Sequence, residues 1–252
     1  MNRDNLTLPP RRIPQTPRVI APAQESHVKG RQRHGTACLG GRYVRGDAST
    51  AMHVLENLKK TLGRVTGVGK PSGNAARRKV RRSKPHAIMF RDDGSIPNNA
   101  RLPFLLYRGA VGLTGSADPA AILEELFNAN DWGDSWRNGI YEYVHYHSHT
   151  HEVLGIARGH ARVRFGGNEG KIIALRSGDV VILPAGTGHQ RISASKQLLV
   201  VGAYPPSGTY DECMPLPEHH ARALKSIPKV PTPAKDPVYG RGGPLQELWR
   251  RT

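Results

Sequence analysis

The chain has 252 residues, enough for one ordinary domain with extensions or for two small domains. Its two cysteines, Cys38 and Cys213, lie far apart and form no CxxC pair, which excludes a disulfide framework and predicts two free thiols. No apolar run reaches the roughly 20 residues that a membrane-spanning helix needs, and the first residues lack the apolar segment of a secretory signal, so we expect a cytoplasmic location.

The net charge of +17 is concentrated in the first third of the chain. Residues 1–84 hold 19 Lys and Arg against 4 Asp and Glu, whereas residues 85–252 hold 18 against 16. The first 50 or so residues are rich in Pro, Arg, Gly and Ser and cannot bury enough apolar surface to offset their ordering entropy. We therefore expect residues 1–84 to be a basic, largely disordered leader, dispensable for folding, and residues 85–252 to be the domain.

One short helix and one basic block interrupt this leader. Apolar residues at steps of three and four predict a helix near residues 54–65. Because Met52 stands just before it, a translation start at Met52 is an open alternative. We interpret the block Arg77–Arg82 as a solvated linker, the alternative being contact with nucleic acid or another anionic surface.

Order is expected from about His86, with a first strand over residues 87–90. Residues 102–107 are apolar but contain Pro103, which is typical of an edge strand or a docking arm. Asp118-Pro119 then predicts a helix, because Asp is a good N-cap and Pro suits the first helical position.

From Gly139 onward the pattern is that of short strands separated by turns. Residues 161–165 alternate apolar and basic side chains, as a half-buried strand does. Further strands are predicted over residues 171–175, 180–183 and 198–203, and a short helix near 217–227. Several short strands at regular spacing predict an all-β sandwich or barrel.

Four histidines and one glutamate crowd into residues 145–152. His145 and His147 are two residues apart, so on a strand both point to the same face and can reach one ion. His189 follows a Pro- and Gly-rich turn that could aim it back toward them. Imidazole suits Zn, Fe, Cu and Ni, and a carboxylate would add charge compensation.

The spacing of these residues resembles the two sequence motifs of the cupin superfamily. The first motif has every gap matched, and its positions are Gly139, His145, His147, Glu152 and Gly159. The second motif matches at Gly178, Pro184, Gly186 and His189. Ser193 stands where Asn is usual, and that Asn is not a metal ligand in the family.

The resemblance extends over about residues 86–249 to the YjlB-like bacterial cupins, whose biochemical role is unassigned. It rests on Pro97-Asn98-Asn99 and on residues 136–139, 151–155 and 201–206. It implies an RmlC-like jelly-roll barrel, or double-stranded β-helix, with a few flanking helices. It also implies one divalent transition metal ion (Fe, Mn, Zn, Ni or Cu) with the ligands His145, His147, Glu152 and His189.

Several residues near the motifs allow more than one interpretation. Glu152 and His151 are adjacent, so only one of them can face inward on a strand, and the resemblance favours Glu152. The tyrosines of this region are interpreted as core or rim aromatics rather than proton donors: Tyr141, Tyr143 and Tyr146. Arg162 and Arg164 are interpreted as an outward, solvated pair, the alternative being an inward Arg that holds an anionic substrate.

The sequence contains no separate nucleophile or triad, so the metal would carry any chemistry. The leading hypothesis is a metal-binding cupin that acts on a small molecule as a dioxygenase or an isomerase. The alternative is a non-enzymatic module that binds or senses a small ligand. A homodimer is the expected assembly, and the basic leader is the segment that would contact nucleic acid or an anionic surface.

Overall fold

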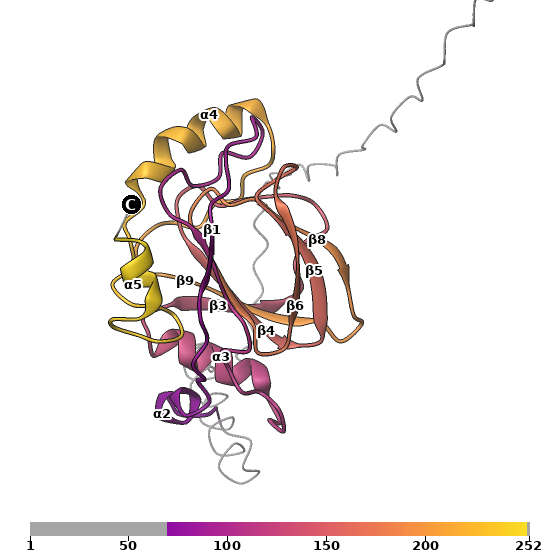
Figure 1. Ribbon diagram of the computed structural model, residues 1–252, viewed down its shortest axis with the longest axis vertical. Helices are drawn as coiled ribbons and strands as arrows, with labels where there is room; N and C mark the ends of the chain where they lie inside the picture. The colour runs from indigo at the N-terminus through magenta and orange to yellow at the C-terminus, as the bar shows by residue number, and fades with distance from the viewer. Residues whose placement is uncertain (1–69, 251–252) are drawn as a thin grey trace, which may run out of the picture. The chain divides into compact units, whose positions relative to one another are not determined.

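The computed structural model describes residues 70–250, which form two antiparallel sheets flanked by short helices (Figure 1). The larger sheet has the strand order β1-β2-β7-β4-β9-β3. Its strands are β1 (His86–Ile88), β2 (Phe104–Tyr107), β7 (Val180–Leu183), β4 (Glu152–Arg158), β9 (Leu199–Tyr204) and β3 (Gly133–Asn138). The smaller sheet, in the order β6-β5-β8, consists of β6 (Lys171–Arg176), β5 (His160–Phe165) and β8 (His189–Ala194). These two sheets confirm the predicted all-β architecture.

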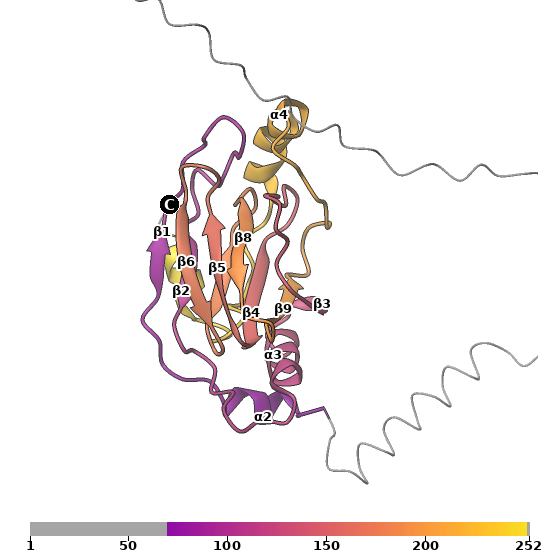
Figure 2. The same cartoon turned by 90° about the vertical axis from the view of Figure 1, so that its right-hand side faces the viewer.

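Helices lie toward both ends of the sheets and beside them (Figures 1 and 2). At one end are α2 (Gly73–Arg77) and α3 (Pro119–Asn128), and at the other is α4 (Pro217–Ser226). The 3-10 helix η1 (Ile227–Lys229) follows α4, and α5 (Pro244–Leu248) is the last helix. No helix within residues 70–250 is long and apolar enough to cross a membrane.

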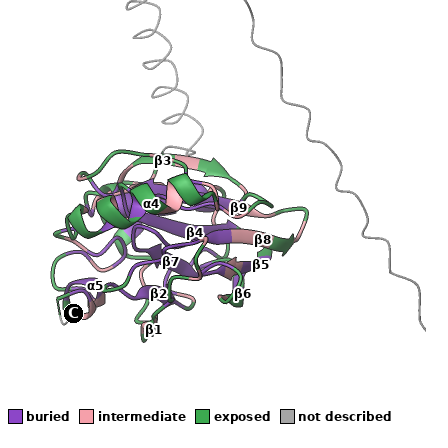
Figure 3. Cartoon of the chain, turned by 90° about the horizontal axis from the view of Figure 1, so that it is seen from above, coloured by how far each residue is buried: buried purple, intermediate pink, exposed green. Residues whose placement is uncertain are grey.

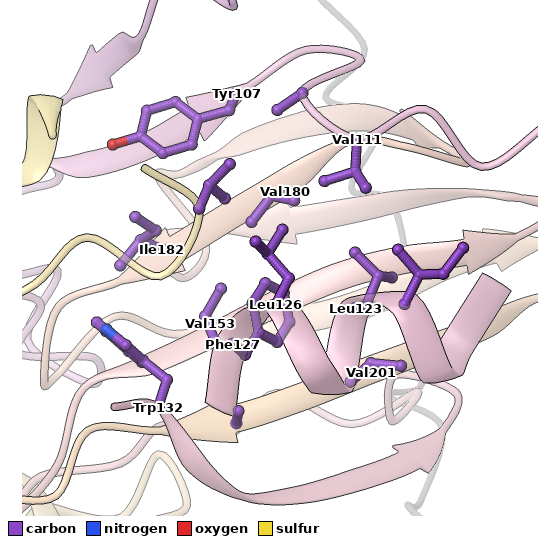
Figure 4. Close-up of a cluster of buried hydrophobic side chains, with 14 of the residues drawn as sticks. Tyr107, Val111, Leu123, Leu126, Phe127, Trp132, Val153, Val180, Ile182 and Val201 are labelled. Atoms are coloured by element: carbon purple, nitrogen blue, oxygen red, sulfur yellow. The ribbon is translucent and has the colours of Figure 1, made fainter. Parts of the chain in front are cut away.

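Both faces of the larger sheet are covered, so its central strands are apolar at nearly every position. Strand β7 is buried throughout, as Figure 3 shows. Val180 and Ile182 pack with Leu123 and Phe127 of α3, whereas the alternate residues of β7 pack against the smaller sheet. Figure 4 shows the first of these two cores. The interior of the barrel therefore lies between the two sheets, on the face of the larger sheet opposite to α3.

Helix α3 begins where its sequence predicts. The Asp118 carboxylate accepts hydrogen bonds from the amides of Ala120 and Ala121, each at 3.1 Å. The helix packs directly on β4 at Gly155, where an added Cβ would lie 2.9 Å from the ring of Phe127. Close approach of α3 to the sheet thus depends on a residue without a side chain.

Order begins earlier than the sequence predicts. The Ser72 side chain caps α2, and Ala76 of this helix is buried in the core that α3 forms with the sheet. Val80 pairs with Val111 in an isolated bridge, and the Tyr239 hydroxyl donates to the carbonyl of Arg81. The expected start of order at His86 is therefore wrong, and the block Arg77–Arg82 is docked rather than a free linker. The helix expected near residues 54–65 lies outside the described residues.

Two further expectations are corrected. Strand β2 is not an edge strand, because β1 pairs on its outer side and β7 on its inner side. His145 is not on a regular strand, since its segment joins the barrel through isolated bridges between His145 and His189 and between Tyr146 and Cys213. Backbone hydrogen bonds nevertheless hold both His145, which pairs with His189, and His147, whose carbonyl accepts from the amide of Gly186.

The last described segment closes the barrel on the side of β2. Asp236 is fully buried and accepts a hydrogen bond from the Tyr107 hydroxyl at 2.6 Å and from the amide of Leu245 at 3.1 Å. The Trp249 indole donates to the carbonyl of Pro103, and its ring contacts the ring of His151. Residues 236–249 therefore connect β2 to the beginning of β4.

Candidate metal centre

Three buried histidines converge inside the barrel. His145 and His147 come from the segment between β3 and β4, and His189 is the first residue of β8. Their candidate ligand nitrogens all lie within 4.8 Å of one another, and the three side chains are at most 5% exposed. The structure thus brings together the three histidines that the motif spacing predicted.

Each of these histidines has its Nδ1 atom beside a backbone carbonyl. The partners are the carbonyl of Tyr143 at 3.4 Å for His145, that of Thr187 at 3.2 Å for His189, and that of Asp211 for His147. When Nδ1 donates its proton to such a carbonyl, Nε2 keeps a free lone pair. Backbone partners of this kind orient imidazoles in metal sites.

Glu152, the first residue of β4, faces the same point. Its Oε2 atom lies 3.5 Å from Nε2 of His147 and 3.5 Å from Nε2 of His189. The side chain is 2% exposed, and Oε2 has no hydrogen-bond donor among the described residues. Because an orphaned buried carboxylate oxygen is costly, this arrangement fits a cation at the centre of the cluster. Three imidazole nitrogens and one carboxylate oxygen are a donor set that suits a divalent transition metal ion.

His151 faces away from this cluster. Its Nδ1 atom accepts a hydrogen bond from the amide of Ala185 at 2.9 Å, and its ring lies 4.8 Å from that of Trp249. Complete burial lowers the pKa of His151 to about 3, so the ring is neutral. The alternation along β4 therefore places Glu152, and not His151, beside the histidines.

Electrostatics divide the four side chains into two kinds. Burial lowers the pKa of His145, and burial with His145 nearby lowers that of His189 to about 3. Burial alone would also lower the pKa of His147, but the Glu152 carboxylate outweighs it and raises that pKa to about 9. Burial raises the pKa of Glu152, yet the neighbouring histidines, His147 first, bring it below its ordinary value. Without a metal ion the cluster thus holds two neutral imidazoles beside a charged His147–Glu152 pair, and a bound metal ion would displace the proton from Nε2 of His147.

A tight turn aims His189 into the barrel. Gly186 has φ 93°, and its amide donates to the carbonyl of His147 at 2.7 Å. An added Cβ at Gly186 would lie 2.7 Å from the backbone oxygen of Asn98, so the position requires glycine. The turn predicted from Pro184 to Gly188 therefore links two of the histidine segments.

Two asparagines brace this turn from a distant part of the chain. Asn98 is buried with φ 50°, donates to the carbonyl of Gly166 at 3.1 Å and accepts from the amide of Gly188 at 3.3 Å. The Asn99 amide donates to the carbonyl of Ala185 at 3.0 Å. In the sequence the Pro97-Asn98-Asn99 run indicates only the family resemblance, and no local pattern predicts this bracing role.

A cavity of about 320 Å³ opens above the histidine cluster. Trp136 forms part of its wall and packs against Gly202, where an added Cβ would lie 2.1 Å from the indole. The Trp136 indole donates to the hydroxyl of Tyr204 at 2.9 Å. Other lining residues are Arg137, Ile140, Tyr141, Leu154 and Tyr210. The four candidate ligands thus form one end of a ligand-sized space.

The remaining candidates from the sequence lie elsewhere or at the edge. Tyr146 is fully buried in a separate apolar cluster, whereas Tyr143 is 41% exposed and stacks on Tyr141. Arg162 is exposed and Arg164 half-buried on β5, and neither lines the cavity. His149 is exposed and lies 3.1 Å from the carboxylate of Asp211. Asp211 itself, whose carbonyl contacts His147, was missed because nothing in its sequence context marks it.

The similarity of the chain to a known protein places it in a family, although no family model matches it. It is 41% identical over 160 residues to "Uncharacterized protein YjlB" of Bacillus subtilis (strain 168), a match that covers 64% of this chain and 93% of that protein.

Solved structures resemble the chain only in part. An acireductone dioxygenase from Bacillus anthracis with a cadmium ion in its active centre is 16% identical, with a TM-score of 0.28 over 38% of this chain and 68% of that one. A double-stranded β-helix protein from Klebsiella pneumoniae is 15% identical, with a TM-score of 0.27 over 55% and 87%. An 11S globulin from Wrightia tinctoria is 17% identical, with a TM-score of 0.26 over 31% of this chain and 21% of the globulin.

These low scores support no statement about activity. The motif spacing, the two antiparallel sheets and the histidine cluster between them are those of a cupin barrel. Together with the near-complete match to the Bacillus subtilis protein, they lead to one conclusion: the chain belongs to the YjlB family and has the cupin fold.

Proposed function

We propose that His145, His147, His189 and Glu152 bind one divalent transition metal ion and that the protein uses this ion to act on a small molecule. The observation that carries the proposal is the orphaned Oε2 of Glu152, which is buried 3.5 Å from two imidazole nitrogens. A cation at this point would satisfy it. The three Nδ1 contacts to backbone carbonyls support the same assignment because they leave the Nε2 atoms free.

When bound, such an ion supplies Lewis acidity or redox chemistry, which suits an isomerase or a dioxygenase. The residues of the chain would do the rest. Trp136 and Leu154 wall the cavity and exclude water. The Tyr204 hydroxyl accepts a hydrogen bond from the Trp136 indole, so its own proton is directed to the Glu152 carboxylate or to an oxygen of a bound ligand. Burial and the nearby Glu152 raise the pKa of Tyr204, so it keeps that proton at neutral pH.

Metal content tests the proposal directly. Protein purified without a His tag should contain about one ion per chain by elemental analysis. His147→Ala and His189→Ala should each lose most of that metal, because each removes one of the converging nitrogens. His160→Ala is the matched control, since this histidine is exposed on β5 and does not line the cavity. Full metal content in both buried-histidine variants would refute the assignment.

Turnover decides between an enzyme and a binding module. If metal-loaded protein converts none of a panel of small diols, phenols and acids under air or under nitrogen but binds one of them, the non-enzymatic alternative takes the place of the isomerase or dioxygenase. That result would leave the proposed metal site and the proposed binding of a small molecule intact.

A further inference from the structure

Three tyrosines, Tyr141, Tyr204 and Tyr210, line the cavity, and Tyr143 stacks on Tyr141. Tyr141 is 44% exposed, Tyr143 41% and Tyr210 54%, although these are large aromatic side chains. Tyr204 lies deeper, half-buried beside the indole of Trp136. Clustered exposed aromatic surface on a folded domain marks a place where something binds. We call these four residues the tyrosine rim.

The rim is ordered and touches the histidine cluster. The rings of Tyr141 and Tyr143 stack with centroids 4.8 Å apart. The Tyr141 ring lies 5.2 Å from that of His145, and the Tyr210 ring lies 5.0 Å from that of His147. A molecule that enters between Tyr141 and Tyr210 therefore reaches the cluster directly.

The carboxylate of Glu212 connects Tyr143 to Tyr210 within the tyrosine rim. Glu212 accepts a hydrogen bond from the Tyr143 hydroxyl at 3.0 Å and from the Tyr210 hydroxyl at 3.2 Å. Tyr143 precedes the histidine pair, whereas Tyr210 and Glu212 follow β9, so the bond joins two segments that are far apart in the sequence. Rings fixed in this way lose less conformational freedom when a ligand binds.

The cavity offers an anion no free cation outside the histidine cluster. Arg137 is the one Lys or Arg among the lining residues described, and its guanidinium makes two 2.7 Å hydrogen bonds to Glu124. It also donates to Asp118 at 3.0 Å. A carboxylate that enters the cavity away from the histidine cluster would therefore lose water without gaining a cationic partner.

We propose that this cavity takes an uncharged, hydroxylated aromatic molecule of the phenol class. Its ring would pack between Tyr141 and Tyr210, and its hydroxyl would face Tyr204 and the histidine cluster, where the polar atoms converge. The volume of about 320 Å³ is at the small end of ligand sites, which fits a single substituted ring. The inference rests on the proposed function and names the substrate class of the same site.

Three probes separate ring, charge and hydroxyl. Phenol, cyclohexanol and benzoate are titrated into the full chain, once loaded with zinc and once treated with chelator, with binding followed by calorimetry or ligand-observed NMR. Phenol should bind about fivefold or more tightly than cyclohexanol, because only the aromatic ring gains from stacking. In the chelator-treated protein benzoate should bind more weakly than phenol. Equal affinity for phenol and cyclohexanol, or tighter binding of benzoate to the chelator-treated protein, would overturn the inference.

Variants of the rim provide the second measurement. Tyr210→Ala should weaken phenol binding about fivefold, whereas Tyr210→Phe, which keeps the ring, should stay within about twofold of the wild type. Leu224→Ala, an exposed apolar residue on α4 away from this cavity, is the control. All three should keep the metal content of the wild type. Unchanged phenol binding in both Tyr210→Ala and Tyr141→Ala would refute the role of the rim.

Failure of the two proposals can be told apart. A wild-type protein that holds no metal refutes the metal site, and the preference of the chelator-treated chain for phenol over cyclohexanol still decides whether the rim selects aromatic rings. A protein that holds metal at His147 and His189 but shows no such preference refutes the substrate class alone.

Discussion

Glu152 is the first residue of β4 and His151 directly precedes it, yet the two side chains lie in opposite surroundings. One carboxylate oxygen of Glu152 faces two imidazoles without a donor, whereas His151 accepts an amide proton from Ala185 and lies against Trp249. The difference follows from the two-residue period of a strand, which sends adjacent side chains to opposite faces.

Substitution of these two residues should therefore have opposite effects. Glu152→Gln keeps the size of the side chain but removes its charge, so metal affinity should fall by more than about tenfold. His151→Ala leaves the Ala185 amide without an acceptor and should cost about 1–3 kcal/mol of stability while metal content stays complete. Chelator competition and chemical denaturation measure the two effects. Loss of metal in His151→Ala alone, with Glu152→Gln fully loaded, would reverse the assignment.

At the scale of elements, the turn that carries His189 depends on Asn98. This side chain satisfies the amide of Gly188 and the carbonyl of Gly166, and its backbone has φ 50°, which Asn adopts more readily than most residues. Asn98→Ala should lower the free energy of unfolding by about 2–3 kcal/mol and also weaken metal binding, because the turn loses its support. Asn168→Ala, in the exposed β5–β6 turn, is the matched control. Wild-type metal affinity in Asn98→Ala would show that the turn holds its shape alone.

Helix α3 supplies a prediction about pH. Partial burial alone raises the pKa of Asp118, but the Ala121 and Ala120 amides and Arg137 outweigh it, so the net pKa lies below its ordinary value of 3.8. A depressed carboxyl pKa stabilises the fold above pH 3.8, and that stabilisation is lost as the pH falls through the folded-state value. Asp118→Ala should cost about 1 kcal/mol at pH 7, as loss of an N-cap does.

The same difference in unfolding free energy should shrink below pH 3.8. Asp118→Asn, which keeps the capping oxygen but loses the charge, should cost less at neutral pH. Denaturation curves of the three proteins at pH 7, 5 and 3 test this. A wild-type advantage that is constant over this range would contradict the role of the ionised carboxylate.

Strong local sequence patterns predicted structural features correctly, whereas features without such a pattern were missed. Asp118-Pro119 predicts the start of α3. The three histidines that the motif spacing predicts to converge, His145, His147 and His189, do lie together. Helix α2 escaped prediction because five residues with one buried alanine carry no periodicity. The support from Asn98 escaped because its partner Gly188 is 90 residues away and appears only when the chain is folded.

For the whole molecule, the contacts of residues 72–81 move the expected N-terminal boundary of the domain from residue 85 to before residue 72. A chain that begins at Pro85 loses the burial of Ala76, the bridge from Val80 to Val111 and the hydrogen bond from Tyr239 to Arg81. We expect its melting temperature to fall by about 4–8 °C, which corresponds to roughly 2 kcal/mol in a domain of this size.

A chain that begins at Lys70 should keep the melting temperature and the metal content of the full chain. The predicted dispensability of residues 1–84 is thereby narrowed to residues 1–69, and it stays a prediction, as do nucleic-acid contact and a homodimer. Calorimetry of the two truncated chains, with elemental analysis, decides the boundary. Equal melting temperatures for the two would place it at Pro85 after all.

The closure of the barrel by residues 236–249 has a consequence for synthesis on the ribosome. Trp249 contacts His151, the residue next to Glu152, and Asp236 binds Tyr107 of β2. Every strand within residues 70–250 has been synthesised by Tyr204, yet the contact of Trp249 with His151 cannot form until about 45 further residues (204 to 249) have left the exit tunnel. A nascent chain stalled soon after β9 should therefore remain sensitive to protease, and resistance should appear only once Trp249 has emerged.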